Sequence, residues 1–144
     1  MTTIVMNTLN GAVTEYDWTF QSITPAYAGD AVALYTLGGD KDGLANIVSE
    51  ATTGNTQWGD AHKKFVEMIY FAVRGDGSGE CIVGTRNDEY RYGFLVQESG
   101  ESRVKPGRGI RENYLSFGFS NPDGSAFTLD RIEVAIVPSA TRRI

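Results

Sequence analysis

The sequence predicts an all-β fold, and three observations carry that prediction. The 144 residues include 17 glycines, and polar residues separate short apolar runs. Turn signals rich in Gly, Asp and Asn recur at a spacing of about 8–12 residues, as in sandwiches and barrels. The length is that of one domain, which can bury about 70% of its unfolded surface. We therefore expect a single antiparallel, jelly-roll-like β-sandwich over residues 1–144, with a short basic C-terminal tail over residues 139–144.

Ten segments have the residue content of strands, and Gly, Asp and Asn mark the turns between them. The expected strands are Thr3–Leu9, Ala12–Phe20, Val32–Leu37, Asn46–Thr53, Lys64–Arg74, Glu80–Arg86, Glu89–Gln97, Arg103–Lys105, Tyr114–Ser120 and Ala126–Val137. The alternative for residues 60–71 is a helix, with Asp60 as its cap and Phe65, Met68 and Ile69 as an apolar stripe. Tyr70, Phe71 and Val73 favour the strand.

The last apolar stretch predicts a hairpin with an irregularity in its second strand. Asn121-Pro122-Asp123-Gly124 has the residues of a type I turn. Before it, Leu115, Phe117 and Phe119 share one face. After it, Phe127 and Leu129 are out of phase with Ile132, Val134 and Ile136. Because side chains alternate along a strand, both sets can be buried on one side only if an extra residue intervenes. We therefore predict a β-bulge near Asp130-Arg131.

The residues do not favour catalysis, a cofactor or a metal. His62 is the only histidine and lies in a polar run beside two lysines. A Ser-His-Asp triad needs a histidine held between a nucleophile and a carboxylate. Cys81 is the only cysteine and lies in the apolar run CIVG, where it is expected to pack as a small hydrophobe. The loop GDGSGE over residues 75–80 lacks the Lys-Ser/Thr of a phosphate-binding loop, so we interpret it as a hairpin loop. We expect no enzyme activity and no cofactor.

The charge distribution argues against nucleic acid as the main partner. The net charge is −5. Residues 1–80 carry ten acidic and four basic side chains, whereas residues 81–144 carry eight acidic and nine basic ones. An acidic total disfavours phosphate backbones. We find no secretory signal and no apolar run of about 18 residues, so we expect a soluble chain made in the cytoplasm, without a membrane partner.

Two surface features point to contacts with other molecules. Trp58 lies in the polar stretch NTQWGD, where a tryptophan marks an interface or ligand contact unless it folds back as a lid over the core. Arg103, Lys105, Arg108 and Arg111 form a basic run whose glycines and proline prevent a regular strand or helix. We expect either a solvated loop or an arginine-rich segment that docks on an acidic protein surface, such as the acidic half of a neighbouring subunit.

Four phrases of the last 40 residues resemble a known family. They are VKPGRGIRENY over residues 104–114, FGFSNPDG over 117–124, FTLDRIEV over 127–134 and the terminal RRI over 142–144. Together they resemble the C-terminal segment of tailed-bacteriophage virion proteins of the tail nozzle, propeller or hub type. The resemblance implies a non-enzymatic structural protein of the virion, which contacts copies of itself and other virion proteins. It implies subunit contacts for Arg108, Arg111, Arg142, Arg143 and Ile144. Proteins of that kind are usually much longer, which leaves open a baseplate component or a capsid decoration protein.

A second resemblance implies a different function. Asp130, just before Ile132-Glu133-Val134, also gives the closing strands a likeness to galactose-binding-like jelly rolls, the fold of carbohydrate-binding modules. On this alternative, Trp58 and nearby tyrosines would engage a cell-surface glycan. Both resemblances imply a β-sandwich, and fold alone does not decide between the functions.

Overall fold

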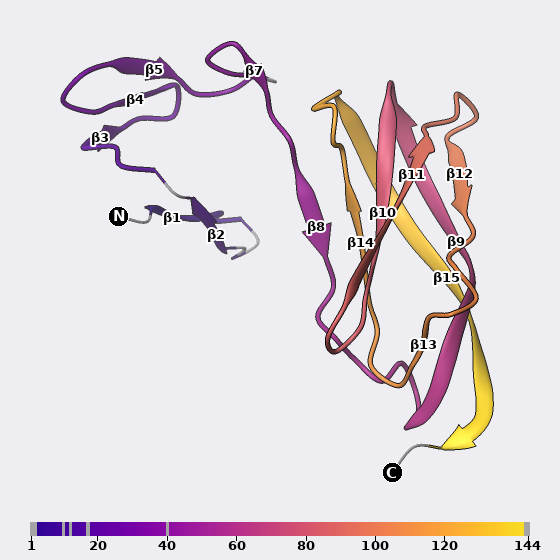
Figure 1. Cartoon of the computed structure of the whole chain (residues 1–144). Helices are drawn as coiled ribbons and strands as arrows, with labels where there is room; N and C mark the ends of the chain where they lie inside the picture. The colour runs from indigo at the N-terminus through magenta and orange to yellow at the C-terminus, as the bar shows by residue number, and fades with distance from the viewer. Residues whose placement is uncertain (1–2, 10, 12, 17, 40, 143–144) are drawn as a thin grey trace. The chain divides into compact units, whose positions relative to one another are not determined.

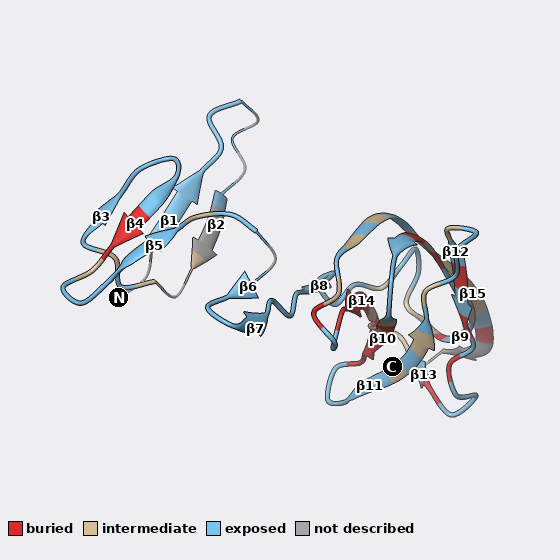
Figure 2. Ribbon diagram, turned by 90° about the horizontal axis from the view of Figure 1, so that it is seen from above, coloured by how far each residue is buried: buried red, intermediate tan, exposed pale blue. Residues whose placement is uncertain are grey.

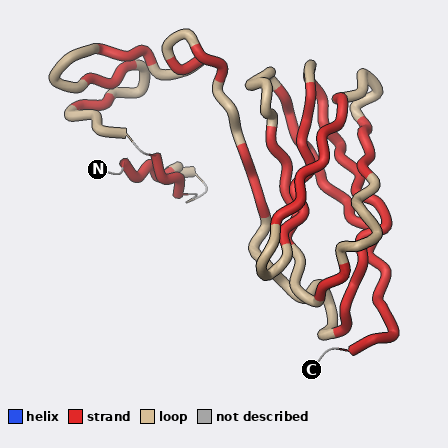
Figure 3. Tube along the Cα trace, in the orientation of Figure 1, coloured by secondary structure: helices blue, strands red, loops and turns tan. Residues whose placement is uncertain are grey.

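The computed structural model describes residues 3–9, 11, 13–16, 18–39 and 41–142, and every regular element among them is a β-strand (Figures 1 and 3). The contacts divide the chain into two units, Met1–Gly39 and Asp40–Ile144. The predicted all-β sandwich is confirmed and lies in the second unit. Its extent differs from the single domain expected over residues 1–144, because the described strands of the first unit pair only with one another. The jelly-roll form of the sandwich stays a prediction.

The first unit consists of two small sheets. Strands β1 (Thr3–Met6) and β2 (Val13–Tyr16) form a hairpin, and β3 (Ser22–Ile23), β4 (Tyr27–Gly29) and β5 (Leu34–Thr36) form a three-stranded antiparallel sheet. Among its residues of described exposure, only Ala28 and Gly29 are buried, as the pale blue ribbon in Figure 2 shows. The unit therefore has almost no core of its own.

The second unit contains the two sheets of the sandwich and a short hairpin, β6 (Lys41–Asp42) with β7 (Ala45–Asn46). The first sheet has the order β11 (Glu89–Leu95), β10 (Ser78–Gly84), β14 (Ser116–Ser120), β8 (Glu50–Thr52). In the second sheet, β9 (His62–Gly75) pairs along its length with β15 (Phe127–Arg142), and β12 (Glu101–Val104) and β13 (Arg111–Glu112) also pair with β9. Because a strand has two edges, β12 and β13 share the edge of β9 that β15 leaves open.

Apolar side chains of both sheets fill the space between them. The buried cluster comprises Val66, Ile69, Phe71, Val73, Cys81, Val83, Val104, Ile110, Leu115, Phe117 and Phe119. The predicted shared face of Leu115, Phe117 and Phe119 is confirmed, since all three are buried. Four phenylalanine rings join the sheets at one end of this core, with Phe71 and Phe127 from the second sheet and Phe94 and Phe119 from the first.

The predicted bulge near Asp130-Arg131 is confirmed. Leu129 pairs with Val73 and Arg131 with Ala72, so Asp130 is the extra residue on β15. Its carboxylate accepts a hydrogen bond from Arg74, at 2.8 Å from Nη2 to Oδ2. The bulge brings Phe127 and Leu129 into phase with Ile132 and Val134, and all four pack against the same core.

A second bulge lies in the partner strand. Ala135 pairs with Met68 and Ile136 with Val66, which leaves Glu67 as an extra residue on β9. Val66 is buried before this point, and Ile69 and Phe71 are buried after it. The predicted strand over residues 64–74 is confirmed, and this bulge explains why its apolar residues resembled a helical stripe.

The turn at residues 121–124 is present, but the predicted hairpin is wrong. Gly124 N donates to Asn121 O at 2.9 Å, as the turn requires. However, β14 pairs with β10 and β8, whereas β15 pairs with β9. The turn is therefore a corner between the two sheets. The Asn121 side chain fixes it, because Asn121 accepts from Ser49 N at 2.6 Å and donates to Ser125 O at 3.0 Å. The loop after Gly75 likewise joins strands of different sheets, β9 and β10.

Candidate assembly surfaces

The basic run over residues 103–111 is an ordered loop between two short strands. Arg103 lies on β12 opposite Tyr70, and Arg111 lies on β13 opposite Phe65. Between them, Pro106 and Ile110 are buried, and Gly107 N donates to the Tyr92 hydroxyl at 3.0 Å. The buried anchors hold the loop against the sandwich and leave its charged side chains outside.

Three of the predicted contact residues meet at one groove. Lys105, Arg108 and Arg111 line a groove of about 530 Å³, together with Phe65, Val66, Glu67 and Pro106. The Phe65 side chain is exposed in the middle of β9. Arg111 donates to the Ser139 hydroxyl and is thereby tied to β15. Lys105 and Arg108 form no ion pair with any described residue. The groove therefore combines apolar floor residues with two cations that have no carboxylate partner in the described part of the chain.

The predicted basic tail is largely a strand. Residues 139–142 continue β15, and Arg142 pairs with His62 at the start of β9. The correction has a simple cause, since β9 begins at His62 and offers partners that far along the sheet. Arg143 and Ile144 lie outside the described residues, as does the side chain of Arg142, so their expected subunit contacts stay predictions.

Trp58 lies over one end of the core. Its indole Nε1 donates to Leu115 O at 2.7 Å, and its ring centroid is 5.5 Å from that of Phe117. This is the core-lid alternative. The residue is nevertheless 42% exposed and has a φ of 45°, a left-handed backbone conformation that is uncommon for a non-glycine residue. One part of the ring seals the core, and the rest is open to a partner.

His62 takes part in a structural cluster with Asp60 and Lys64. The Lys64 residue is only 3% exposed, and its Nζ donates to Asp60 O, Asp60 Oδ1 and His62 O at 2.6, 2.8 and 2.9 Å. All three ammonium protons are therefore satisfied, as a buried charge requires. The hydrogen bond from Lys64 and that from His62 N lower the pKa of Asp60 to about 2. The cluster fastens the start of β9.

Cys81 is fully buried in β10, as predicted for a packed hydrophobe. Burial raises the pKa of its thiol to about 12. Since the thiolate is the nucleophilic form of cysteine, this side chain is inert at neutral pH.

Arg91 forms ion pairs with three carboxylates on the open face of the first sheet. Its guanidinium lies 3.0 Å from Glu80, 3.0 Å from Glu50 and 2.7 Å from Glu89. Hydrogen bonds to Glu80, Glu50 and Glu89 raise the pKa of Arg91 above its ordinary value. The cluster cross-links strands β8, β10 and β11, and its one guanidinium charge offsets one of the three carboxylate charges.

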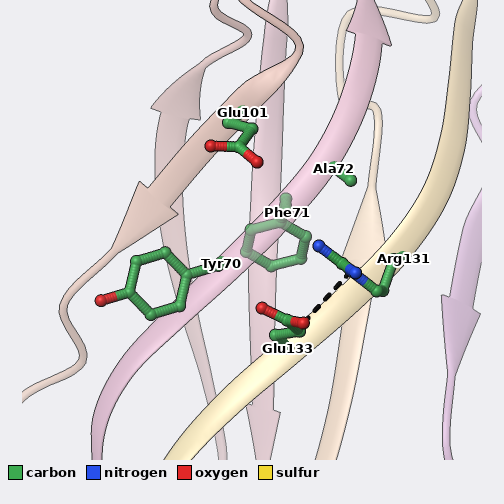
Figure 4. Close-up of a pocket in the computed structure, with 6 residues that line it drawn as sticks. All are labelled: Tyr70, Phe71, Ala72, Glu101, Arg131 and Glu133. Carbon is green, nitrogen blue, oxygen red and sulfur yellow. Dashed lines mark ion pairs between the residues drawn. The ribbon is translucent and has the colours of Figure 1, made fainter.

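A second hollow lies on the second sheet (Figure 4). Tyr70, Phe71, Ala72, Glu101, Arg131 and Glu133 line it, and the Arg131 and Glu133 side chains form an ion pair at 3.3 Å. Its volume is about 150 Å³. Small-molecule sites usually offer about 300 Å³ or more, so this hollow is no binding pocket.

The N-terminal unit exposes most of its apolar side chains. The exposed large ones are Ile4, Val5, Met6, Leu9, Val13, Ile23, Tyr27, Val32, Leu34 and Tyr35. The adjoining residues Leu44, Ile47 and Val48 of the second unit are exposed as well. Soluble monomers rarely expose so many apolar side chains within one short stretch, and such surfaces mark contacts with other proteins. Sequence reasoning did not find this surface, because the same residues read equally well as strands of a buried sandwich.

An aromatic row crosses the same unit. The rings of Tyr16 and Trp18 are stacked, with centroids 3.9 Å apart and an interplanar angle of 10°. The row continues from Trp18 to Phe20 at 5.3 Å and from Phe20 to Tyr35 at 5.4 Å. The sequence predicted that Tyr16, Trp18 and Phe20 share a face inside a sandwich core. In the structure they are only half-buried.

The described residues include no group of three or more His, Cys, Asp and Glu side chains arranged to hold a metal ion. Within the same residues no helix is long and apolar enough to cross a membrane. No protein-family model matches the chain, and neither does any curated protein or solved structure.

Proposed function

We propose that this chain is a non-enzymatic structural protein of a bacteriophage virion, a tail-associated component that assembles through contacts with copies of itself and with other virion proteins. The observation that carries the proposal is the apolar surface of the N-terminal unit. Its exposed side chains lie on short strands with almost no core beneath them. A unit of this size is marginal alone and usually needs a disulfide, a metal or association with another chain. The only cysteine is in the other unit, so association is the stabilisation that we propose.

Three further features support the proposal. The resemblance of residues 104–144 to tail nozzle, propeller and hub proteins points to the same class. The basic loop is held in place by Pro106 and Ile110, which suits a contact surface that binds without large rearrangement. The single thiol is buried and inert at neutral pH.

Quantitative mass spectrometry of purified virions from the source phage tests the proposal. We expect a copy number equal to one or a few rings. A copy number near that of the major capsid protein would instead identify a capsid decoration protein and overturn the tail assignment. Absence from the purified particle would overturn the virion assignment altogether.

The aromatic row favours one alternative, a carbohydrate-binding module. Partly exposed, aligned rings are a common platform for the apolar face of a sugar, and Trp18 lies at the centre of this row. The sequence pointed to Trp58 for this role; part of its ring is exposed, but its indole N–H is held by Leu115 O and the ring packs against Phe117. On this alternative, Trp18→Ala abolishes retention of the chain on host cell-surface glycans and Trp58→Ala does not. Retention that neither substitution changes, or no retention by the unmodified chain, would exclude it.

A further inference from the structure

The groove beside the basic loop and the N-terminal unit are complementary in charge. Residues 1–39 contain three acidic residues, Glu15, Asp17 and Asp30, and no lysine, arginine or histidine. The groove presents Lys105, Arg108 and Arg111 against a single acid, Glu67. Opposite charges at an interface speed association and set its register, so each of these surfaces is a suitable partner for the other.

The two surfaces are also complementary in their apolar content. The groove contains the exposed ring of Phe65, whereas its other apolar lining residues, Val66 and Pro106, are buried. The N-terminal unit offers apolar side chains that are almost fully exposed, among them Leu9 at 96% and Val32 at 93%. Apolar contact at the centre with charged pairs at the rim is the usual composition of a protein interface. The groove volume of about 530 Å³ accommodates several side chains of such a unit.

We infer that the groove receives the N-terminal unit of a second copy of the chain. Lys105 and Arg108 then face the acidic residues of that copy, of which the structure describes the side chain of Asp30, and Phe65 is covered by its apolar side chains. Every copy offers its N-terminal unit and receives another in its groove, so the contact joins two different surfaces. It is therefore heterologous and generates a ring when the rotation closes. This inference rests on the proposed function and adds the surface and the partner through which the subunits assemble.

Chemical cross-linking between unlabelled and ¹⁵N-labelled copies of the chain tests the inference directly. Full-length chain is prepared at natural abundance and with ¹⁵N, and the two are mixed in equal amounts under dilute conditions. The mixture is then concentrated and treated with a carbodiimide, which joins an amine to a carboxylate. We expect Lys105 joined to Glu15, Asp17 or Asp30 in peptide pairs that combine one light and one heavy partner. Like-isotope pairs alone would mean that each unit docks on its own chain, and the inference would be wrong. Absence of any link between Lys105 and residues 1–39 would overturn it too.

Charge reversal provides an independent measurement. In the double variant Lys105→Glu/Arg108→Glu, the self-association constant from sedimentation velocity should fall about tenfold or more, and the salt dependence of association should weaken. The control Lys41→Glu/Arg74→Glu makes the same change of charge at residues that do not line the groove, with Arg74 at the opposite end of β9 from Phe65, and should associate like the unmodified chain. Reversing the proposed partners as well, with Glu15→Lys/Asp17→Lys, should restore association of the groove variant.

The outcomes separate this inference from the proposed function. Unchanged association of the groove variant overturns the docking of the N-terminal unit, whereas presence of the protein in the virion still supports the structural role. Absence from the virion overturns the structural role, whereas mixed-isotope links in the purified chain still support the contact. Circular dichroism of each variant verifies the β-fold, which the exposed positions of Lys105 and Arg108 should leave intact.

Discussion

At the scale of single residues, close packing decides which core positions tolerate change. Gly79 on β10 lies against the rings of Phe94 and Phe119, two of the four phenylalanines that join the two sheets. A Cβ at this position would lie 2.7 Å from Phe119 Cε2 and 2.8 Å from Phe94 Cζ. Those rings are themselves packed against Phe71 and Phe127, so they cannot move aside independently.

We therefore expect Gly79→Ala to destabilise the sandwich by about 1–3 kcal/mol, the usual cost of an overpacked core. The matched control is Gly93→Ala on the neighbouring strand, because a Cβ at Gly93 meets no atom within 4 Å. Its free energy of unfolding should stay within about 0.5 kcal/mol of the unmodified value. Urea unfolding followed by intrinsic fluorescence measures both. Equal stability of the two variants would contradict the packing argument.

The Asp60 carboxylate makes stability depend on pH at the acid end. The hydrogen bond from Lys64 lowers its pKa from 3.8 to about 2 in the folded chain. A carboxyl group with a lowered pKa stabilises the fold above its unfolded pKa and loses that contribution as the pH falls towards its folded pKa. We expect the difference in unfolding free energy between the unmodified chain and Asp60→Asn to shrink between about pH 4 and pH 2. A difference that is constant across this range would show that the pairing with Lys64 contributes nothing.

At the scale of secondary-structure elements, the bulges of β9 and β15 determine which face each strand buries. With Asp130 and Glu67 as extra residues, Phe71 pairs with Ile132, Ile69 with Val134 and Val66 with Ile136. A shift of one residue moves a strand's whole apolar set to the opposite face. The carboxylate of Asp130 contributes less than the presence of the extra residue, because both side chains of its ion pair with Arg74 are exposed to solvent.

Two changes at position 130 separate register from charge. Deletion of Asp130 should turn Phe127 and Leu129 away from the core and cost about 3 kcal/mol or more. Asp130→Ala keeps the extra residue and removes only the exposed ion pair, so it should cost at most about 1 kcal/mol. Thermal unfolding of both variants measures the difference. If Asp130→Ala were as destabilising as the deletion, the ion pair rather than the bulge would hold this part of the sheet.

At the scale of the whole molecule, the sequence predicts strands well and their neighbours poorly. The phase change between Leu129 and Ile132 is visible in the sequence, and it correctly predicts the bulge. The corner at Asn121–Gly124 was mistaken for a hairpin because a type I turn looks the same whether it joins paired strands or two sheets. The position of Lys105 and Arg108 on a loop was predicted from the composition of that loop. The exposed side chains of residues 4–48 were not, since an apolar strand in the sequence carries no sign of what covers it.

The apolar surface predicts how the chain responds to substitution as a monomer and as an assembly. Val32 and Leu9 are 93% and 96% exposed, so Val32→Lys and Leu9→Lys should change the free energy of unfolding by at most about 0.5 kcal/mol. Both should nevertheless weaken incorporation into particles, because each buries a charge in the proposed contact. Ser99→Lys, at an exposed polar position of the other unit, is the control. Normal incorporation of both lysine variants would mean that this surface stays in solvent.

The pairing of β9 with β15 also determines the point during synthesis at which the sandwich can fold. Gly75 pairs with Phe127 and His62 with Arg142, so β9 waits for a partner strand that the ribosome makes more than 50 residues later. Strands that pair over such a sequence distance do so slowly, because the entropy cost of closing the loop comes before any contact stabilises the pair. Until β15 emerges, the growing chain carries an unpaired edge along β9 and a core that lacks Phe127, Leu129, Ile132 and Val134. A nascent chain that stalls within β15 cannot complete the second sheet and is therefore a target for chaperones and proteases. Only chains that contain all of β15 enter assembly.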